Sequence, residues 1–331
     1  MGIEPGQILD GKYRVGRLIG EGGMGTVYEG ENSRIGRRVA IKVLHARIAA
    51  MPEFVERFER EAKAAARIGS RHVCDVLDLG DLPSGDRYIV MEFLDGVSFE
   101  DRLAAKGKLT AAQLAPIAFE LLEGLGTMHN ARVIHRDLKP ANVLLTRDGQ
   151  PKIADFGLAR DLVQESSQTQ TGQILGTPSY MAPEQALGIP SMIGPPTDVY
   201  ALGAILYEML TGQPPFIAPT VIETLDLVRS QEPVPPRRLQ PKIPRDLETI
   251  CLKCLEKRPQ QRYASAQLLA DDLSRFLDGK PVHARPVSTI TRIAARPTTA
   301  RDFDASVRAA VRYCGGCDRW TESVSHDSDR E

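Results

Sequence analysis

The stretch His-Arg-Asp-Leu-Lys-Pro-Ala-Asn at residues 135–142, followed by Asp-Phe-Gly at residues 155–157, decides the fold of this chain. Asp137 is an acid that can accept a hydroxyl proton, and Lys139 follows it by two residues. Asn142 and Asp155 add an amide and a carboxylate that are able to hold magnesium. These residue types are the ones that transfer of a γ-phosphate requires.

The overall composition excludes some classes of protein. The 331 residues suffice for one large two-lobed enzyme or two average domains, with ample chain to bury a core. The 42 Lys and Arg residues nearly balance the 43 Asp and Glu residues, and the basic residues are scattered along the chain. We therefore expect no nucleic-acid partner.

Cysteine usage and hydropathy predict a cytoplasmic protein without a membrane segment. The five cysteines are too few and too unevenly placed for a secreted disulfide framework. No apolar stretch follows a basic start, and the most apolar helix candidate, Val199 to Leu210, is short and contains Tyr207 and Glu208. We expect neither a signal peptide nor a membrane span.

The spacing of apolar residues divides the chain into a β-rich part and a helical part. Between Tyr13 and Met91 it predicts strands at 13–18, 26–30, 38–43, 73–79 and 87–91, with one helix at 52–68. After Gly96 it predicts helices at 99–105, 111–129, 199–211, 221–230, 247–256 and 265–277. The fold class is α+β, with a small β-rich lobe joined to a larger α-helical lobe.

A glycine cluster, Gly-Glu-Gly-Gly-Met-Gly at residues 20–25, lies between the first two predicted strands. Glycines there allow backbone N–H groups to approach phosphate oxygens that side chains would hold away. Strands on both sides argue against a dinucleotide-binding fingerprint, which runs from a strand into a helix. Taken alone, such a cluster is more often a plain hairpin, so its context decides.

Lys42 lies on a strand, Val39-Ala40-Ile41-Lys42, that is otherwise suited to burial. A lysine on a buried strand needs an acidic partner, and Glu61 of the following helix is the predicted one. The alternative is a lysine whose ammonium group reaches water.

With these motifs in place, residues from about Tyr13 to Leu277 resemble the eukaryotic-type, or Hanks-type, protein serine/threonine kinases. Two stretches, residues 20–25 and Gly-Thr-Pro-Ser-Tyr-Met-Ala-Pro-Glu-Gln at 176–185, resemble the bacterial branch. The resemblance implies the two-lobed protein kinase fold. It divides the chain into a lead-in (1–12), an N-lobe (13–91), a hinge (92–96), a C-lobe (97–281) and a loosely ordered tail (282–331).

The resemblance also implies catalytic roles. Asp137 would be the catalytic base, Lys139 would neutralise the γ-phosphate, and Lys42 paired with Glu61 would hold the α- and β-phosphates. Asn142 and Asp155 would bind Mg²⁺, for which Mn²⁺ is an alternative. Met91 would guard the back of the adenine pocket, ahead of a hinge whose backbone pairs with adenine. The implied ATP-binding residues are Gly20, Glu21, Gly22, Gly23, Met24, Gly25, Val27, Ala40, Lys42, Met91, Glu92 and Leu94.

Three further residues receive architectural roles from the resemblance. Glu184 is expected to pair with Arg262 in the interior, and Asp198 is expected to brace the catalytic loop. None of the three is predicted to take part in the chemistry.

The polar segment between Gly157 and Ala182 resembles an activation loop. Arg136 would await a phosphorylated residue in this loop, and we predict autophosphorylation at Thr169 or Thr171, with a homodimer phosphorylating in trans. Thr177 would shape the acceptor pocket. The alternative for this segment is a solvated Ser/Thr-rich loop.

Two cysteine pairs have the spacing of a metal half-site. Cys251 and Cys254 fall on one apolar helical stripe, which predicts core residues. Cys314 and Cys317 flank two glycines, a spacing that would also suit a zinc knuckle, with His326 as a candidate ligand, or a reducible disulfide.

The sequence thus predicts an ATP- and Mg²⁺-dependent protein serine/threonine kinase that acts on protein substrates in bacterial signalling. One alternative is a pseudokinase, a binding or scaffolding module without turnover. Such proteins usually lose an equivalent of Lys42, Asp137 or Asp155, and all three are present. A small-molecule phosphotransferase on a related fold is the second alternative.

Overall fold

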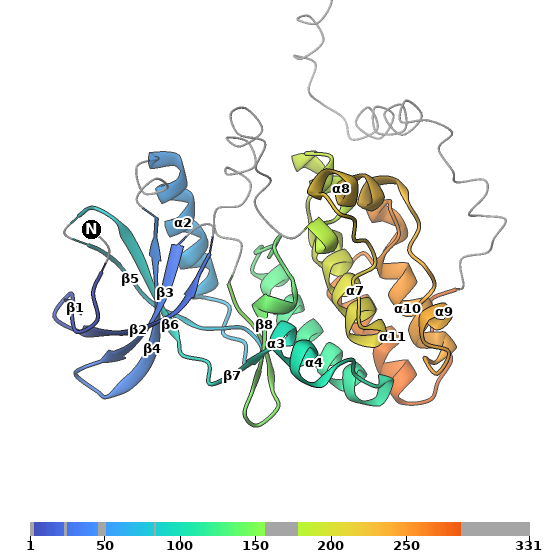
Figure 1. The fold of residues 1–331 in the computed structure, drawn as a ribbon, viewed down its shortest axis with the longest axis horizontal. Helices are drawn as coiled ribbons and strands as arrows, with labels where there is room; N and C mark the ends of the chain where they lie inside the picture. Colours follow the sequence, from blue (N-terminus) through green and yellow to red (C-terminus); the bar gives the residue numbers. More distant parts are fainter. Residues whose placement is uncertain (1–2, 23–24, 46–50, 83, 156–177, 286–331) are drawn as a thin grey trace, which may run out of the picture. The chain divides into compact units, whose positions relative to one another are not determined.

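The structure, a computed structural model, describes residues 3–22, 25–45, 51–82, 84–155 and 178–285. The described part has a β-rich N-terminal region and a helical C-terminal region (Figure 1). This is the expected α+β arrangement of two lobes.

An antiparallel sheet of six strands forms the N-lobe, in the order β1-β2-β3-β4-β6-β5. The strands are β1 (Ile8–Leu9), β2 (Tyr13–Glu21), β3 (Gly25–Asn32), β4 (Arg37–Leu44), β5 (Val76–Asp81) and β6 (Arg87–Glu92), with helix α2 (Pro52–Ala65) between β4 and β5. Strand alternation gives β4 two buried faces. Ala40 belongs to the core shared with the C-lobe, whereas Val39 and Ile41 belong to a second core.

The N-lobe begins earlier than the sequence predicts. Ile3 and Leu9 are buried in the second core, and Ile8 and Leu9 pair with β2. A strand of two residues is too short for alternation to be recognised. The segment expected to be a lead-in is thus part of the sheet's packing.

A second sheet of three short strands, in the order β7-β8-β9, follows the hinge. The strands are β7 (Gly96–Ser98), β8 (Val143–Thr146) and β9 (Pro151–Ile153), and the sequence analysis predicted none of them. Each has three or four residues, which is below the length at which a period of two becomes visible. This sheet positions the functional motifs, because β8 begins directly after Asn142 and β9 ends two residues before Asp155.

Helices make up the rest of the C-lobe. They are α3 (Phe99–Lys106), α4 (Ala111–Asn130), α6 (Pro183–Ala186), α7 (Pro195–Thr211), α8 (Val221–Ser230), α9 (Pro236–Leu239), α10 (Arg245–Cys254) and α11 (Ala266–Leu277). Helix α7 is buried along most of its length and packs on α10 and α4 (Figure 1). It begins four residues before the predicted start because Pro195 and Pro196 occupy the first turn, where a missing N–H costs nothing.

The C-lobe extends slightly beyond the predicted boundary at residue 281. Asp272, a buried acid of α11, accepts hydrogen bonds from the backbone N–H groups of His283 and Ala284, at 2.6 and 2.8 Å. Tyr263 donates a third, at 2.9 Å. An acidic residue in a helical pattern is expected to be exposed to solvent, so the sequence did not predict these contacts of Asp272.

Cys251 and Cys254 are fully buried on α10, which confirms that they are core residues. Cys314, Cys317 and His326 lie outside the described residues. Within the described ranges, no helix combines the length and apolarity needed to cross a membrane.

We expect Gly203→Ala to destabilise the protein because its new Cβ atom would lie 2.4 Å from the Cβ atom of Cys254. Overpacking of this kind costs about 1–3 kcal/mol. Gly126→Ala on α4 is the matched control, since no atom lies within 4 Å of its added Cβ. Helix propensity should make the control neutral or more stable by up to about 1 kcal/mol. Urea unfolding of both variants tests this, and equal stabilities would contradict the observed packing of α7 on α10.

Candidate active site

The catalytic loop, residues 135–142, is held by a buried carboxylate from another element. Asp198 of α7 accepts hydrogen bonds from the backbone N–H groups of His135 and Arg136, each at 2.9 Å. Arg136 has a φ of 64°, which non-glycine residues rarely adopt. Asp198 therefore holds the loop in a strained shape, and the prediction that it braces the loop is confirmed.

His129 of α4 completes this buried anchor. Its Nε2 atom donates a hydrogen bond to Asp198 Oδ2 at 2.8 Å. Burial raises the pKa of the Asp198 carboxyl, but the hydrogen bond and charge of His129, together with the charge and backbone amide of His135, outweigh burial and hold the pKa below its ordinary value. Asp198 is thus a buried anion fixed by three donors.

Asp137, Lys139 and Asn142 lie close together at the end of the loop. Lys139 Nζ is 3.3 Å from Asp137 Oδ2. The Asn142 amide donates to the Asp137 backbone carbonyl at 2.8 Å and lies 3.5 Å from Asp137 Oδ2. Burial lowers the pKa of Lys139. The fold therefore unites an acid, an ammonium group and an amide within hydrogen-bonding reach.

Asp155 reaches the same region from the end of β9. Its φ of 54° is again in the left-handed region, and the Ala154 carbonyl just before it accepts a hydrogen bond from His135 Nε2 at 3.0 Å. Lys42 forms a hydrogen-bonded ion pair with the Asp155 carboxylate. Burial raises the pKa of Asp155, yet the charge and hydrogen bond of Lys42 prevail and lower it.

The predicted pairing of Lys42 with Glu61 differs from the contacts that the structure gives. Lys42 is joined to Asp155, whereas a Glu61 carboxylate oxygen lies 3.8 Å from a guanidinium nitrogen of Arg136. Both Glu61 and Asp155 are acids that follow the strand, and only the tertiary arrangement decides which one approaches the lysine.

The sheet register places the predicted nucleotide-binding residues of the N-lobe on one face. Val27 lies opposite Lys42, and Ala40 lies opposite Met91. Gly25 allows β3 to approach β4 closely, because a Cβ atom there would lie 2.2 Å from the Val43 carbonyl oxygen. Gly22 donates its amide to the Gly25 carbonyl at 2.9 Å, which closes the loop. Gly23 and Met24 lie outside the described residues.

Glu92 and Leu94 lie where the chain passes from β6 to β7. The Glu92 carboxylate pairs with Lys152 of β9 at 2.7 Å, and Leu94 packs against the shared core. The sequence analysis assigned no role to Lys152.

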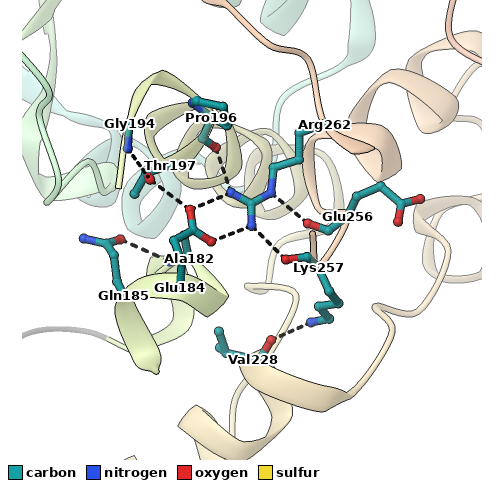
Figure 2. A network of polar contacts seen from close by, with 10 residues as sticks. All are labelled: Ala182, Glu184, Gln185, Gly194, Pro196, Thr197, Val228, Glu256, Lys257 and Arg262. Atoms are coloured by element: carbon teal, nitrogen blue, oxygen red, sulfur yellow. Dashed lines mark hydrogen bonds and ion pairs between the residues drawn. The ribbon is translucent and has the colours of Figure 1, made fainter. Parts of the chain in front are cut away.

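Glu184 and Arg262 form a buried ion pair, as predicted (Figure 2). Two parallel bonds of 2.8 and 2.7 Å join them, and neither side chain has more than 1% of its surface exposed. Thr197 donates to the same carboxylate at 2.8 Å. Arg262 donates its remaining N–H groups to the backbone carbonyls of Pro196, Glu256 and Lys257. All five guanidinium donors are satisfied, which is what a buried charge requires.

The donor chemistry of the site fits magnesium. Asn142 uses its amide nitrogen toward Asp137, which leaves its carbonyl oxygen as a ligand, and Asp155 supplies a carboxylate. Mg²⁺ prefers such oxygen ligands and commonly takes only one or two from the protein. No cluster of three His, Cys, Asp or Glu side chains that could enclose a metal occurs among the described residues. Asn142 and Asp155 would therefore be the residues that hold the ion.

Several predicted residues cannot be placed. Thr169, Thr171 and Thr177 lie outside the described residues, together with Phe156 and Gly157. The predictions for the activation loop and the acceptor pocket stay predictions.

Sequence reasoning missed His129 and Gln185. The sequence gives His129 no role, although its side chain bonds to Asp198. Gln185 donates its side-chain amide to the Arg136 backbone carbonyl at 2.8 Å. His129 lies outside every motif, and Gln185 ends the stretch 176–185 without any sign of this contact, since each acts through a contact with a segment distant in sequence.

Comparison with known proteins agrees with this geometry. The model of the protein kinase domain matches residues 13–274. A probable serine/threonine-protein kinase of Streptomyces coelicolor is 38% identical over 290 residues, which cover 85% of this chain and 42% of that protein. The serine/threonine-protein kinase PknB of Mycobacterium leprae is 37% identical, over 85% of this chain and 45% of its own length.

Solved structures show the same fold. The kinase domain of Mycobacterium tuberculosis PknI matches with a TM-score of 0.66 and 28% identity, over 83% of this chain and 99% of that domain. The chain belongs to the protein kinase family, and the resemblance to the bacterial serine/threonine branch is confirmed. It spans less than half the length of the curated relatives described above.

We expect Asp198→Asn to cost about 3 kcal/mol of stability, because an amide cannot accept from all three donors and leaves buried N–H groups unpaired. Because folding lowers the pKa of Asp198, its carboxylate stabilises the folded protein at every pH above the ordinary aspartate pKa. This stabilisation is lost as the pH falls through the lowered pKa of the folded state. The stability of the variant should therefore decrease less than that of the wild type when the pH is lowered. The control is Asp226→Asn on α8, where the side chain is 64% exposed. Urea unfolding between pH 3 and 7 measures the stability of both variants. Equal stabilities over this range would contradict the role of Asp198 in holding the loop.

Proposed function

We propose that this domain transfers the γ-phosphate of ATP to serine or threonine hydroxyls of proteins, as part of bacterial signalling. The carrying observation is that Asp137, Lys139 and Asn142 lie together in one loop. The same loop is bonded through His135 to Ala154, next to Asp155, and Asp155 pairs with Lys42 of β4. Their residue types are those that phosphoryl transfer needs, and their positions suit one reacting centre.

In this proposal Asp137 orients the acceptor hydroxyl and takes its proton, while Lys139 offsets charge on the phosphoryl group. The short distance between their side chains supports a joint role. Asn142 and Asp155 would hold Mg²⁺, which supplies neutralisation of phosphate charge when bound. Lys42 would bind the phosphates, and its ion pair with Asp155 keeps both groups in place beforehand.

Two observations favour proteins over small molecules as acceptors. The segment Gly176-Thr177-Pro178 before Ala182-Pro183-Glu184 suits docking of a peptide, and its second half is fixed by the buried Glu184–Arg262 pair. The curated relatives are named serine/threonine-protein kinases. We further place the domain in the cytoplasm, where ATP is available; its buried, unpaired cysteines Cys74, Cys251 and Cys254 fit a reducing compartment.

Regulation by phosphorylation of the activation loop is part of the proposal. Arg136 would receive a phosphate from Thr169 or Thr171, with one copy of the chain acting on another. The contact of Arg136 with Glu61 supports a switch, since a phosphate would compete with this carboxylate for the guanidinium group.

Asp137→Asn should abolish self-phosphorylation, because removal of a catalytic base costs about a hundredfold or more in rate. Protein stripped with a phosphatase is incubated with ATP and Mg²⁺, and its intact mass is measured. The control is Asp148→Asn, which removes an exposed acid from the neighbouring β8–β9 turn. Added phosphate on the wild type and the control alone is the expected result. A wild type that binds nucleotide but gains no mass, even with generic protein substrates, would favour the pseudokinase alternative.

Thr169→Ala combined with Thr171→Ala should remove most phosphate from the activation loop and lower activity toward an added substrate. Phosphopeptide mapping of an active wild-type preparation provides the direct measurement. Ser166→Ala combined with Ser167→Ala is a matched control within the same segment. If both threonines are unmodified in active protein, this regulatory role is wrong.

A further inference from the structure

A chain of charged side chains connects three strands of the N-lobe with the hinge. Glu29 of β3 accepts a hydrogen bond from Arg17 of β2 at 2.8 Å, and two from Arg38 of β4, at 2.9 and 2.6 Å. These hydrogen bonds lower the pKa of Glu29. None of the three residues takes part in the site described above.

Arg38 also contacts the hinge. Its guanidinium carbon lies 3.9 Å from the centre of the Phe93 ring. The strand register explains the contact. Val39 pairs with Glu92, the last residue of β6, so Arg38 lies beside Phe93. A planar guanidinium can stack on a ring and bind a carboxylate at once, which an ammonium cannot do in the same way.

The C-lobe holds the same short segment from its other end. Lys152 pairs with Glu92 at 2.7 Å, with only 12% and 23% of their side chains exposed. Arg147 lies 3.1 Å from the Asp95 carboxylate and donates its backbone N–H to the Asp95 carbonyl at 3.2 Å. Residues 92–95 therefore have side-chain partners on both lobes, and Arg38 is the partner from the sheet that stacks on the hinge.

These contacts are better suited to positioning the hinge than to stabilising the whole fold. Half of the Arg38 side chain is exposed, and exposed ion pairs contribute little to folding. Among the described residues, however, the hinge has no ladder partner between Phe93 and Asp95, so side-chain contacts add to the backbone hydrogen bond from Arg147 to Asp95 in holding it. A small restraint on a short irregular segment changes its local freedom more than the stability of the whole lobe.

We propose that Arg38 is a positioning residue for nucleotide binding: by stacking on Phe93 while bonded to Glu29, it fixes the hinge backbone against the sheet. This role rests on the proposed function, because it assumes that the hinge backbone pairs with adenine. Arg38 itself touches neither nucleotide nor acceptor. A preorganised hinge binds the base without first losing conformational freedom.

The test compares Arg38→Ala, Phe93→Ala and the double variant with Arg37→Ala, which removes the same charge from the adjacent exposed position. Calorimetry with a non-hydrolysable ATP analogue and Mg²⁺ measures affinity. Because a hinge freed by the substitution has to be ordered when the nucleotide binds, we expect about threefold to tenfold weaker binding in Arg38→Ala. The two single effects should not add in the double variant, and Arg37→Ala should bind like the wild type. Arg38→Lys keeps the charge but loses the planar group, so we expect it to bind as weakly as Arg38→Ala.

A second measurement does not depend on the nucleotide. Hydrogen exchange of the hinge amides in the nucleotide-free protein should accelerate in Arg38→Ala and not in Arg37→Ala, with little change in melting temperature. If Arg38→Ala matches Arg37→Ala in both affinity and exchange, or if Arg38→Lys restores both, the stacking role is wrong. A wild type that binds no nucleotide would instead overturn the proposed function, and with it this role.

Discussion

The carboxylate of Asp198 accepts hydrogen bonds from two consecutive backbone amides of the catalytic loop and a third from His129. The loop needs this support because Arg136 adopts a left-handed backbone conformation, which costs about 1–3 kcal/mol outside glycine. A loop with such a shape persists only when its surroundings determine it. Helix α7, buried along most of its length, provides the rigid base from which a single anion does so.

The remaining groups of the site depend on this anchored loop through short links. His135 connects the loop to Ala154, and thereby sets the position of Asp155 at the end of β9. Asn142 bonds back to Asp137, which keeps the end of the loop closed. Lys42 then joins the N-lobe sheet to Asp155. One buried carboxylate thus underlies an arrangement that includes residues from both lobes.

The ion pairs of this protein differ in how far they are buried. Glu184 and Arg262 are removed from water completely, and every donor of the guanidinium group has an acceptor, so the pair fixes geometry without leaving an unpaired charge (Figure 2). The charges around the hinge stay partly exposed and weak, as at Arg38, Asp95 and Arg147. A fully buried ion pair supports the C-lobe, and less buried ones surround the segment where the lobes join.

Sequence alone determined the two-lobed fold, the six long helices of the C-lobe and the members of the catalytic loop, because each of these carries a local signal. Periodicity reveals a long helix, and a motif reveals residues whose chemistry requires neighbours close in sequence. It also predicted the Glu184–Arg262 pair and the brace by Asp198 through family resemblance. Only the tertiary structure decided that Lys42 meets Asp155, that Glu61 approaches Arg136, that His129 bonds to the Asp198 side chain and that Gln185 holds the Arg136 backbone. These contacts join segments far apart in the chain, and no spacing of residues records which of several acids or donors will be nearest once the lobes are packed.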